Sequence, residues 1–300
     1  MKPLRLFAGL LAALLVIFSS LWPSAARAQT LEIGAPPDLI PWLPSVVPPV
    51  VPPAWKRYSQ AMPEAAEGAP LIALLIDDMG EARAWTLRAM ALPGPLSMAF
   101  FPHAPNVAAQ AEAARAAGHE LMLHMPMEPA GDDEDPGPDA PLLGLDEDEL
   151  DRRVVTMLDS FPGYVGVNNH MGSRFTRDGA AMNLVLARVK QRGLLFVDSR
   201  TVVDTVGERL ARSLEIPSLR RDIFIDNESN PGEIAARLNQ LEALARERGF
   251  AVGIAHPRPA TLDVLEVWLP KALARGVVLA PISAIIGRGL DVNYAEQIVE

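Results

Sequence analysis

The sequence predicts an α/β protein folded as an irregular (β/α) barrel of about seven or eight parallel strands. Short apolar runs alternate with longer amphipathic stretches between residues 71 and 290, and polar residues close several of the apolar runs. Strands that are separated by helices must pair in parallel. A doubly wound open sheet is the alternative, but the chain has neither a GxGxxG nor a GxxxxGK[ST] nucleotide-binding loop to support it.

The elements follow in chain order from the period of their apolar residues. Gly118, Gly193, Gly249 and Gly276 each stand between a predicted helix and the next strand, where glycine ends a helix. The predicted strands are 71–76, 95–100, 120–123, 164–168, 194–197, 223–225, 251–255 and 277–280. The predicted helices are 81–91, 106–117, 146–160, 178–192, 205–214, 231–248 and 260–274.

Residues 1–28 have the features of a secretory signal peptide. Lys2 and Arg5 precede an apolar run that ends at Trp22, and small residues surround a cleavage site after Ala28. The mature chain is therefore expected to be exported, with the bacterial periplasm as its destination. The alternative is an uncleaved membrane anchor, because the run is near the lower length limit for crossing a bilayer.

The remaining sequence divides into three parts. Residues 29–70 are rich in proline and are predicted to form a tether, either extended or draped over the domain, with Trp42 and Trp55 to dock it. Residues 71–290 form the predicted barrel, and residues 291–300 are a C-terminal tail.

Composition excludes several classes of function. The chain has no cysteine, so disulfides, thiol catalysis and thiolate metal sites are ruled out. Its formal net charge of -10 and pI near 5.1 argue against a nucleic-acid partner.

Acidic and histidine residues close the predicted strands. Asp77 and Asp78 follow the first strand, while His124, His170 and His256 end later apolar runs. The carboxyl ends of barrel strands meet at one rim, so these residues are expected to converge. Two adjacent acids repel one another unless a cation or a proton relieves them, which indicates a metal site. Strand alternation predicts that Asp77 and Asp78 point to different sides.

Other polar residues have two interpretations. Asp198 and Asp226 fall at the same rim, but an Asp after a strand also caps the following helix. Arg174 and Arg200 are expected either to pair with acids or to act in the site. His119 begins the strand that precedes His124 and is predicted to be structural. The acidic residues 132–135 form either a solvated loop or a lid.

A set of short motifs resembles a known family. IDDMG, GHELMLHMPMEP, NNHMGSRFT, FVDSRT and AHPRP occur in order from about residue 70 to residue 289. The set is similar to the divergent polysaccharide deacetylases, a branch of the NodB-homology carbohydrate deacetylases. The resemblance implies a NodB-like barrel and a metal-dependent hydrolase.

Residue roles are also implied by the resemblance. Asp77 matches the general base, His256 the general acid, and Asp78 and His124 two metal ligands. Glu128 stands where the usual third histidine would be, and His170 is its replacement. The usual Arg-x-Pro-Tyr motif is missing, so Arg174 or Arg200 is expected to supply its cation. The predicted substrate-contacting or supporting residues are Glu128, Arg174, Asp198, Arg200 and Asp226.

One carboxylate and two imidazoles suit a divalent metal, with Zn²⁺ preferred. The metal would polarise an acyl group and activate water, Asp77 would accept the proton of the water, and His256 would protonate the leaving group. The predicted reaction removes N-acetyl or O-acetyl groups from a carbohydrate, such as a cell-wall or matrix polysaccharide. Two alternatives stay open: a catalytically silent periplasmic carbohydrate-binding module, and a 2-His-1-carboxylate iron enzyme.

Overall fold

The computed structural model describes residues 51–289. The predicted signal peptide, Trp42 and the C-terminal tail 291–300 lie outside these residues. Within the described range, no helix is both long and apolar enough to cross a membrane.

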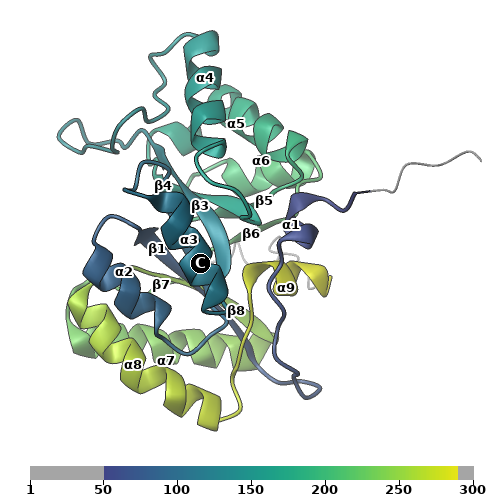
Figure 1. Cartoon of the computed structure of the whole chain (residues 1–300), viewed down its shortest axis with the longest axis vertical. Coiled ribbons are helices and arrows are strands. Elements are labelled where there is room, and N and C mark those ends of the chain that lie inside the picture. Colours follow the sequence, from purple (N-terminus) through teal and green to yellow (C-terminus); the bar gives the residue numbers. More distant parts are fainter. Residues whose placement is uncertain (1–50, 290–300) are drawn as a thin grey trace, which may run out of the picture. The chain divides into compact units, whose positions relative to one another are not determined.

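A parallel sheet of nine strands forms the centre of the domain (Figure 1). The strand order is β6-β5-β4-β3-β2-β1-β8-β7, with β9 paired to β1, and every recorded pair is parallel. The strands are β1 Leu71–Met79, β2 Ser97–Phe100, β3 Glu120–Met127, β4 Gly166–Met171, β5 Leu195–Asp198, β6 Ser218–Arg220, β7 Ile223–Phe224, β8 Phe250–Ala255 and β9 Val278–Leu279.

This strand order confirms the predicted irregular (β/α) barrel. Strands β1 to β6 are neighbours in chain order, and β1 also pairs with β8, as in a barrel whose wall is open between β6 and β7. A doubly wound sheet would instead reverse direction at a switch point in mid-sheet. The prediction missed β6 because its three residues, Ser-Leu-Arg, contain a single large apolar side chain.

Each predicted helix is present, and most helix ends have a local cause. Asp146, Asp178 and Asn230 accept hydrogen bonds from the first backbone N–H groups of the helices that follow them. The helices are α1 Ala54–Arg57, α2 Arg83–Met90, α3 Val107–Ala116, α4 Glu147–Leu158, α5 Gly179–Gln191, α6 Gly207–Ser213, α7 Pro231–Arg248, α8 Pro259–Ala274 and α9 Ile282–Gly287, with a 3-10 turn, η1, at Phe175–Arg177.

Strand β1 is buried on both faces. Ile72, Leu74 and Ile76 pack in one apolar cluster, whereas Leu71 and Leu75 belong to a second cluster on the other face. This double burial explains why the strand reads as a continuous apolar run rather than an alternating one. Because β1 lies between β2 and β8, its carboxyl end, with its two acids, is inside the rim and not at an edge of the sheet.

The segment before β1 lies against the domain. The backbone N–H of Trp55 donates to the carbonyl oxygen of Gly193 at 3.0 Å, and Trp55, Tyr58 and Met62 pack against the apolar cluster that contains Leu71. The expected docking of Trp55 is therefore confirmed.

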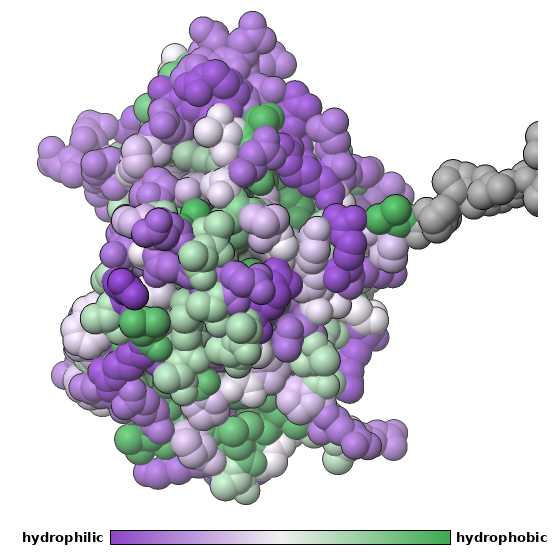
Figure 2. Space-filling model, viewed as in Figure 1, coloured by the Kyte–Doolittle hydropathy of each residue, from purple (hydrophilic) through white to green (hydrophobic). Residues whose placement is uncertain are grey.

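Hydrophilic side chains gather over α4 and the loop that precedes it (Figure 2). Residues Gly131 to Asp135 of that loop are exposed, and they include the acidic run 132–135. This part of the surface is strongly solvated.

Candidate metal centre

A β-bulge brings both acids of β1 to one side. Ile76 pairs with Met98 and Met79 with Phe100, so β1 has one residue more than β2 over this interval. Asp78 takes up the difference with a left-handed φ of 53°. The expectation that Asp77 and Asp78 point to different sides is wrong, because the bulge interrupts the alternation. Nε2 of His124 lies 3.7 Å from Oδ2 of Asp77 and 3.2 Å from Oδ1 of Asp78.

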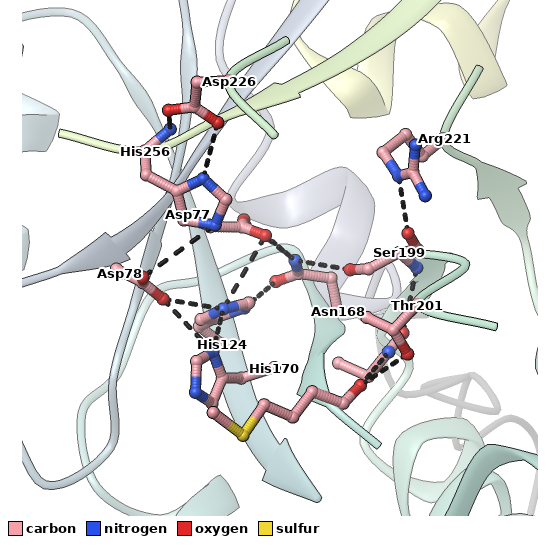
Figure 3. Close-up of polar contacts among 12 residues, drawn as sticks. Asp77, Asp78, His124, Asn168, His170, Ser199, Thr201, Arg221, Asp226 and His256 are labelled. Carbon is pink, nitrogen blue, oxygen red and sulfur yellow. Dashed lines mark hydrogen bonds and ion pairs between the residues drawn. The ribbon is translucent and has the colours of Figure 1, made fainter. Parts of the chain in front are cut away.

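Asp78, His124 and His170 lie close together (Figure 3). We call their three potential metal-binding atoms the donor set. Oδ1 of Asp78 is 3.2 Å from Nε2 of His124 and 3.2 Å from Nδ1 of His170, and the two nitrogens are 3.2 Å apart. These three residues come from β1, β3 and β4, as the sequence predicted. They form a group capable of holding a metal ion.

The geometry of this triangle fits a tetrahedral metal ion. Metal–ligand bonds of about 2.0–2.1 Å at tetrahedral angles place neighbouring donor atoms about 3.3 Å apart. The buried Oδ1 atom of Asp78 has no hydrogen-bond partner within the described residues, so its lone pairs are not satisfied by the protein. Three protein donors leave the fourth tetrahedral position open, which is typical of catalytic rather than structural zinc sites.

Asn168 connects the histidine ligand to the second acid. Nδ1 of His124 donates to Oδ1 of Asn168 at 3.1 Å, which leaves Nε2 with its lone pair toward Asp78 and His170. The Asn168 amide donates to both carboxylate oxygens of Asp77, at 2.9 and 3.0 Å, and to Oγ of Ser199 at 3.1 Å. Asn168 was missed at the sequence level, although it precedes His170 by two residues and therefore shares its side of β4.

Asp77 has the properties of a base that works near neutral pH. Burial raises the pKa of its carboxyl to about 6, although the charges of His124 and His256 act in the opposite direction. The side chain is almost fully buried. Asp78 differs: burial acts to raise its pKa, but the adjacent imidazoles of His124 and His170 hold the pKa well below its usual value. The two adjacent acids are thus driven apart in acidity.

His256 forms a buried dyad with Asp226. Nδ1 of His256 donates to Oδ1 of Asp226 at 2.8 Å, while Oδ2 of Asp226 accepts from the His256 backbone N–H and from Oγ1 of Thr261, each at 2.8 Å. Burial acts to lower the pKa of His256, but the hydrogen bond and charge of Asp226 outweigh it and raise the pKa. Nε2 lies 3.9 Å from Oδ2 of Asp78, so it faces the donor set. Asp226 therefore holds the ring of His256 in place.

Aromatic rings enclose the cluster. The ring of Phe101 lies 4.7 Å from that of His170 and 5.1 Å from that of His124, measured between centroids. The ring of Phe224 packs edge-on against His256 at 5.4 Å. Neither aromatic residue stood out in the sequence, because each reads as the apolar end of a strand.

A cavity of about 290 Å³ opens beside the cluster. Asp77, His124, His170 and His256 contribute to its wall. Arg200, predicted as a site residue, lines the same cavity, together with Arg221, which lies outside the sequence motifs.

Three predicted site residues lie elsewhere. Glu128 accepts from the Arg174 guanidinium at 3.1 Å and from the Leu143 backbone N–H at 2.6 Å, and Arg174 also binds Asp132 at 2.8 Å. These contacts fasten the loop after β3 instead of reaching the cavity. Asp198 accepts from the backbone N–H groups of Arg200 and Glu208 and from Thr205, so it organises the loop before α6. The side chains of Glu128, Arg174 and Asp198 therefore make their hydrogen bonds within nearby loops and not in the cavity.

His119 is structural, as predicted. Nδ1 accepts from the Leu96 backbone N–H at 3.2 Å, and Nε2 donates to the Met90 carbonyl oxygen at 3.0 Å. These bonds hold the segment between α2 and β2.

Two known proteins are similar to this chain in sequence, and one solved structure is similar to it in fold. YibQ, an uncharacterised protein of Escherichia coli K12, is 32% identical over 196 residues, which are 65% of this chain and 61% of YibQ, less than two thirds of its length. An uncharacterised Haemophilus influenzae protein is 33% identical over 200 residues, 66% of this chain and 70% of that protein. The crystal structure of the uncharacterised ATU2773 from Agrobacterium tumefaciens C58 superposes with a TM-score of 0.74 at 26% identity, covering 78% of this chain and 95% of that one.

The family model for divergent polysaccharide deacetylases matches residues 74–286. The matched range begins inside β1 and ends in α9, so it contains the whole donor set, the Asp226–His256 dyad and the cavity. The chain belongs to the divergent polysaccharide deacetylase family.

Proposed function

We propose that the protein is an exported, metal-dependent hydrolase that removes N-acetyl or O-acetyl groups from a carbohydrate. The observation that carries the proposal is the triangle of Asp78, His124 and His170, whose donor atoms are each 3.2 Å from the other two. Zn²⁺ is the preferred ion, because a carboxylate and two imidazoles suit it and tetrahedral bonds reproduce this spacing.

The protein groups around the triangle supply the acid–base steps. A bound divalent ion would polarise the acyl oxygen and lower the pKa of water. Asp77, ionised above a pKa of about 6, accepts the proton of the attacking water. Protonated His256, held by Asp226, donates from Nε2 to the departing amine or alcohol. Acetate and a free amino or hydroxyl group are the products.

The substrate class and the location rest on separate observations. Membership of the family supports a carbohydrate, and a cell-wall or matrix polysaccharide suits an exported protein. Export to the periplasm is proposed from the signal-peptide features of residues 1–28. Retention at a membrane would follow only if that segment stays uncleaved.

The test separates the two acids. We expect Asp78→Asn to lose bound zinc, because it removes a ligand charge, whereas Asp77→Asn retains zinc and loses about 10²-fold or more in hydrolysis. Zinc content is measured by metal analysis after dialysis, and hydrolysis by acetate release from a panel of acetylated sugars.

Arg174→Gln serves as the control, because it changes a charge outside the cavity and should alter neither readout. Equal zinc loss from the two Asp variants would contradict the division of roles. Zinc binding without acetate release from any sugar would favour the silent carbohydrate-binding module.

A further inference from the structure

Two arginines line the cavity that contains Asp77 and His256. Arg200 follows β5 and Arg221 lies between β6 and β7, so both stand at the open part of the barrel wall. Both are half-buried. Within residues 51–289, neither guanidinium has a carboxylate partner within ion-pair distance, whereas most of the other arginines here do.

The Arg221 guanidinium is held in a fixed orientation. Nε donates to the carbonyl oxygen of Ser199 at 2.7 Å (Figure 3). Nη2 donates to the carbonyl oxygen of Arg200, also at 2.7 Å. Its central carbon lies 4.9 Å from the centroid of the Phe224 ring. Nη1 has no hydrogen bond to any described residue. One arm of a rigid fork is therefore available to a ligand in the cavity.

Arg200 is held by its backbone and not by its side chain. Its φ is 48°, a left-handed conformation that costs a non-glycine residue about 1–2 kcal/mol. Oδ1 of Asp198 accepts from its backbone N–H at 2.9 Å and stabilises the turn. The guanidinium itself makes no hydrogen bond within the described part of the chain. Strain that presents an unpartnered charge to a cavity indicates a functional position.

The positive charges of Arg200 and Arg221 repel each other. Burial and the charge of Arg200 lower the pKa of Arg221, and the nearby Asp77, Asp198 and Asp222 offset only part of this effect. In a chain with a net charge of -10, two arginines without carboxylate partners in one cavity are not a consequence of composition. An anion between them would relieve their repulsion.

We propose that Arg200 and Arg221 form an anion subsite that binds a carboxylate of the substrate. This inference rests on the proposed function and narrows its substrate to an N-acylated sugar that carries a carboxylate. Guanidinium groups match the planar geometry of a carboxylate and bind it more strongly than neutral donors do. The cavity is at the lower end of the usual range for ligand sites, about 300–1,000 Å³, which suits one sugar unit with its substituent.

Binding is measured by titration calorimetry in the zinc-loaded full chain carrying Asp77→Asn, so that turnover does not consume the probe. The probes are two matched pairs: N-acetylglucosaminuronic acid with its methyl ester, and N-acetylmuramic acid with its methyl ester. Each pair keeps the shape of the sugar nearly constant while the charge changes. The variants are Arg200→Gln, whose side chain supports no other described residue, and Arg221→Gln. Arg209→Gln, on the exposed face of α6, is the matched control for charge.

We expect at least one acid to bind about tenfold more tightly than its ester. Arg200→Gln and Arg221→Gln should abolish that preference, and Arg209→Gln should preserve it. The proposal is overturned if neither acid binds more tightly than its ester, or if the preference survives both cavity substitutions. Sodium acetate binding that depends on Arg200, without any acid–ester difference, would assign the subsite to released acetate and also overturn it.

Turnover by the chain with Asp77 intact separates this inference from the proposed function. Charge-dependent binding without turnover of any acylated sugar would reject the hydrolase and keep the anion subsite. Turnover of neutral and acidic sugars alike, without charge-dependent binding, would reject the subsite alone.

Discussion

The side-chain amide of Asn168 contacts both His124 and Asp77: its oxygen accepts from one and its nitrogen donates to the other. As an acceptor it fixes the ring of His124, a proposed ligand, and as a donor it stabilises the ionised form of Asp77, the proposed base. A single amide thereby sets both the tautomer of one residue and the acidity of the other.

Replacement of Asn168 with Asp separates these two effects. The new carboxylate still accepts from His124, but it no longer donates to Asp77 and adds a like charge beside it. The pKa of Asp77 should rise further above its value of about 6. Because the base works only when ionised, activity is lost as pH falls through this pKa, so the acidic limb of the pH–rate profile should move upward by about one unit.

The control for this substitution is Ser199→Ala, which removes only the third acceptor of the Asn168 amide. It should leave the acidic limb in place. An unchanged limb in Asn168→Asp would mean that Asp77 is not the group titrating there.

The residues of the donor set were predictable because each closes an apolar run, and parallel strands bring such positions together. The residues that surround the donor set were harder to predict from the sequence. Phe101 reads as core, and Arg221 lies in a short stretch with weak strand character. Glu128 and Arg174 were assigned to the site by their motif, but local pairing decides their positions. Sequence proximity to a motif does not show which way a long side chain points.

At the scale of elements, the strand cores could be predicted, but their ends could not. Strands β1 and β3 run past the predicted ends at residues 76 and 123 and include Asp77, Asp78 and His124. A carboxylate or imidazole looks like a strand terminator because polar residues are rare in buried strands. Here these side chains gather at the proposed metal site, and the backbone pairing of β1 and β3 continues past them.

Close contact between β4 and β5 depends on Gly166. A Cβ atom at this position would lie 2.6 Å from the Leu195 carbonyl oxygen and 2.4 Å from a methyl carbon of the Leu195 side chain. Gly166→Ala should therefore lower the free energy of unfolding by about 1–3 kcal/mol, because the backbone contact cannot relax as a side chain could. Urea denaturation followed by circular dichroism measures this change.

Gly179 provides the comparison, since a Cβ there meets no atom within 4 Å at the start of α5. Gly179→Ala should be neutral or stabilising by up to about 1 kcal/mol. Similar free energies of unfolding for the two variants would show that β4 and β5 can move apart at Gly166 without loss of stability.

At the scale of the whole molecule, Glu120 joins the end of the domain to its centre. Its carboxyl accepts from Oγ of Ser97 at 3.0 Å and from the backbone N–H and the hydroxyl of Ser283, while Ser97 also accepts from the Ile282 N–H. Residues of β2, β3 and α9 are thereby tied together at the end of the barrel opposite the metal centre. Burial raises the pKa of Glu120, although the bonds from Ser283 and Ser97 oppose it.

This raised pKa makes a contribution to stability that depends on pH. Folded Glu120 holds its proton more tightly than the unfolded chain, so its contribution is largest below the unfolded pKa near 4.5 and falls as pH rises toward the folded pKa. Glu120→Gln stays neutral throughout. The variant should therefore gain stability relative to the natural chain as pH rises through this window, and the difference should then level off.

Unfolding in urea at a series of pH values measures the difference, and the subtraction removes the other carboxylates. A constant difference across the window would show that Glu120 titrates normally in the folded protein.

The pairing of β1 with β8 also governs how the domain is made. Leu71 pairs with Phe250, so the central strand finds one of its neighbours only after nearly all of the domain has been synthesised. Until then the emerging polypeptide holds every proposed metal ligand while β1 presents an apolar edge, and such edges promote aggregation. Long-range pairing of this kind is slow to form. The domain is therefore expected to be most prone to aggregation in the interval before β8 has been made and has paired with β1.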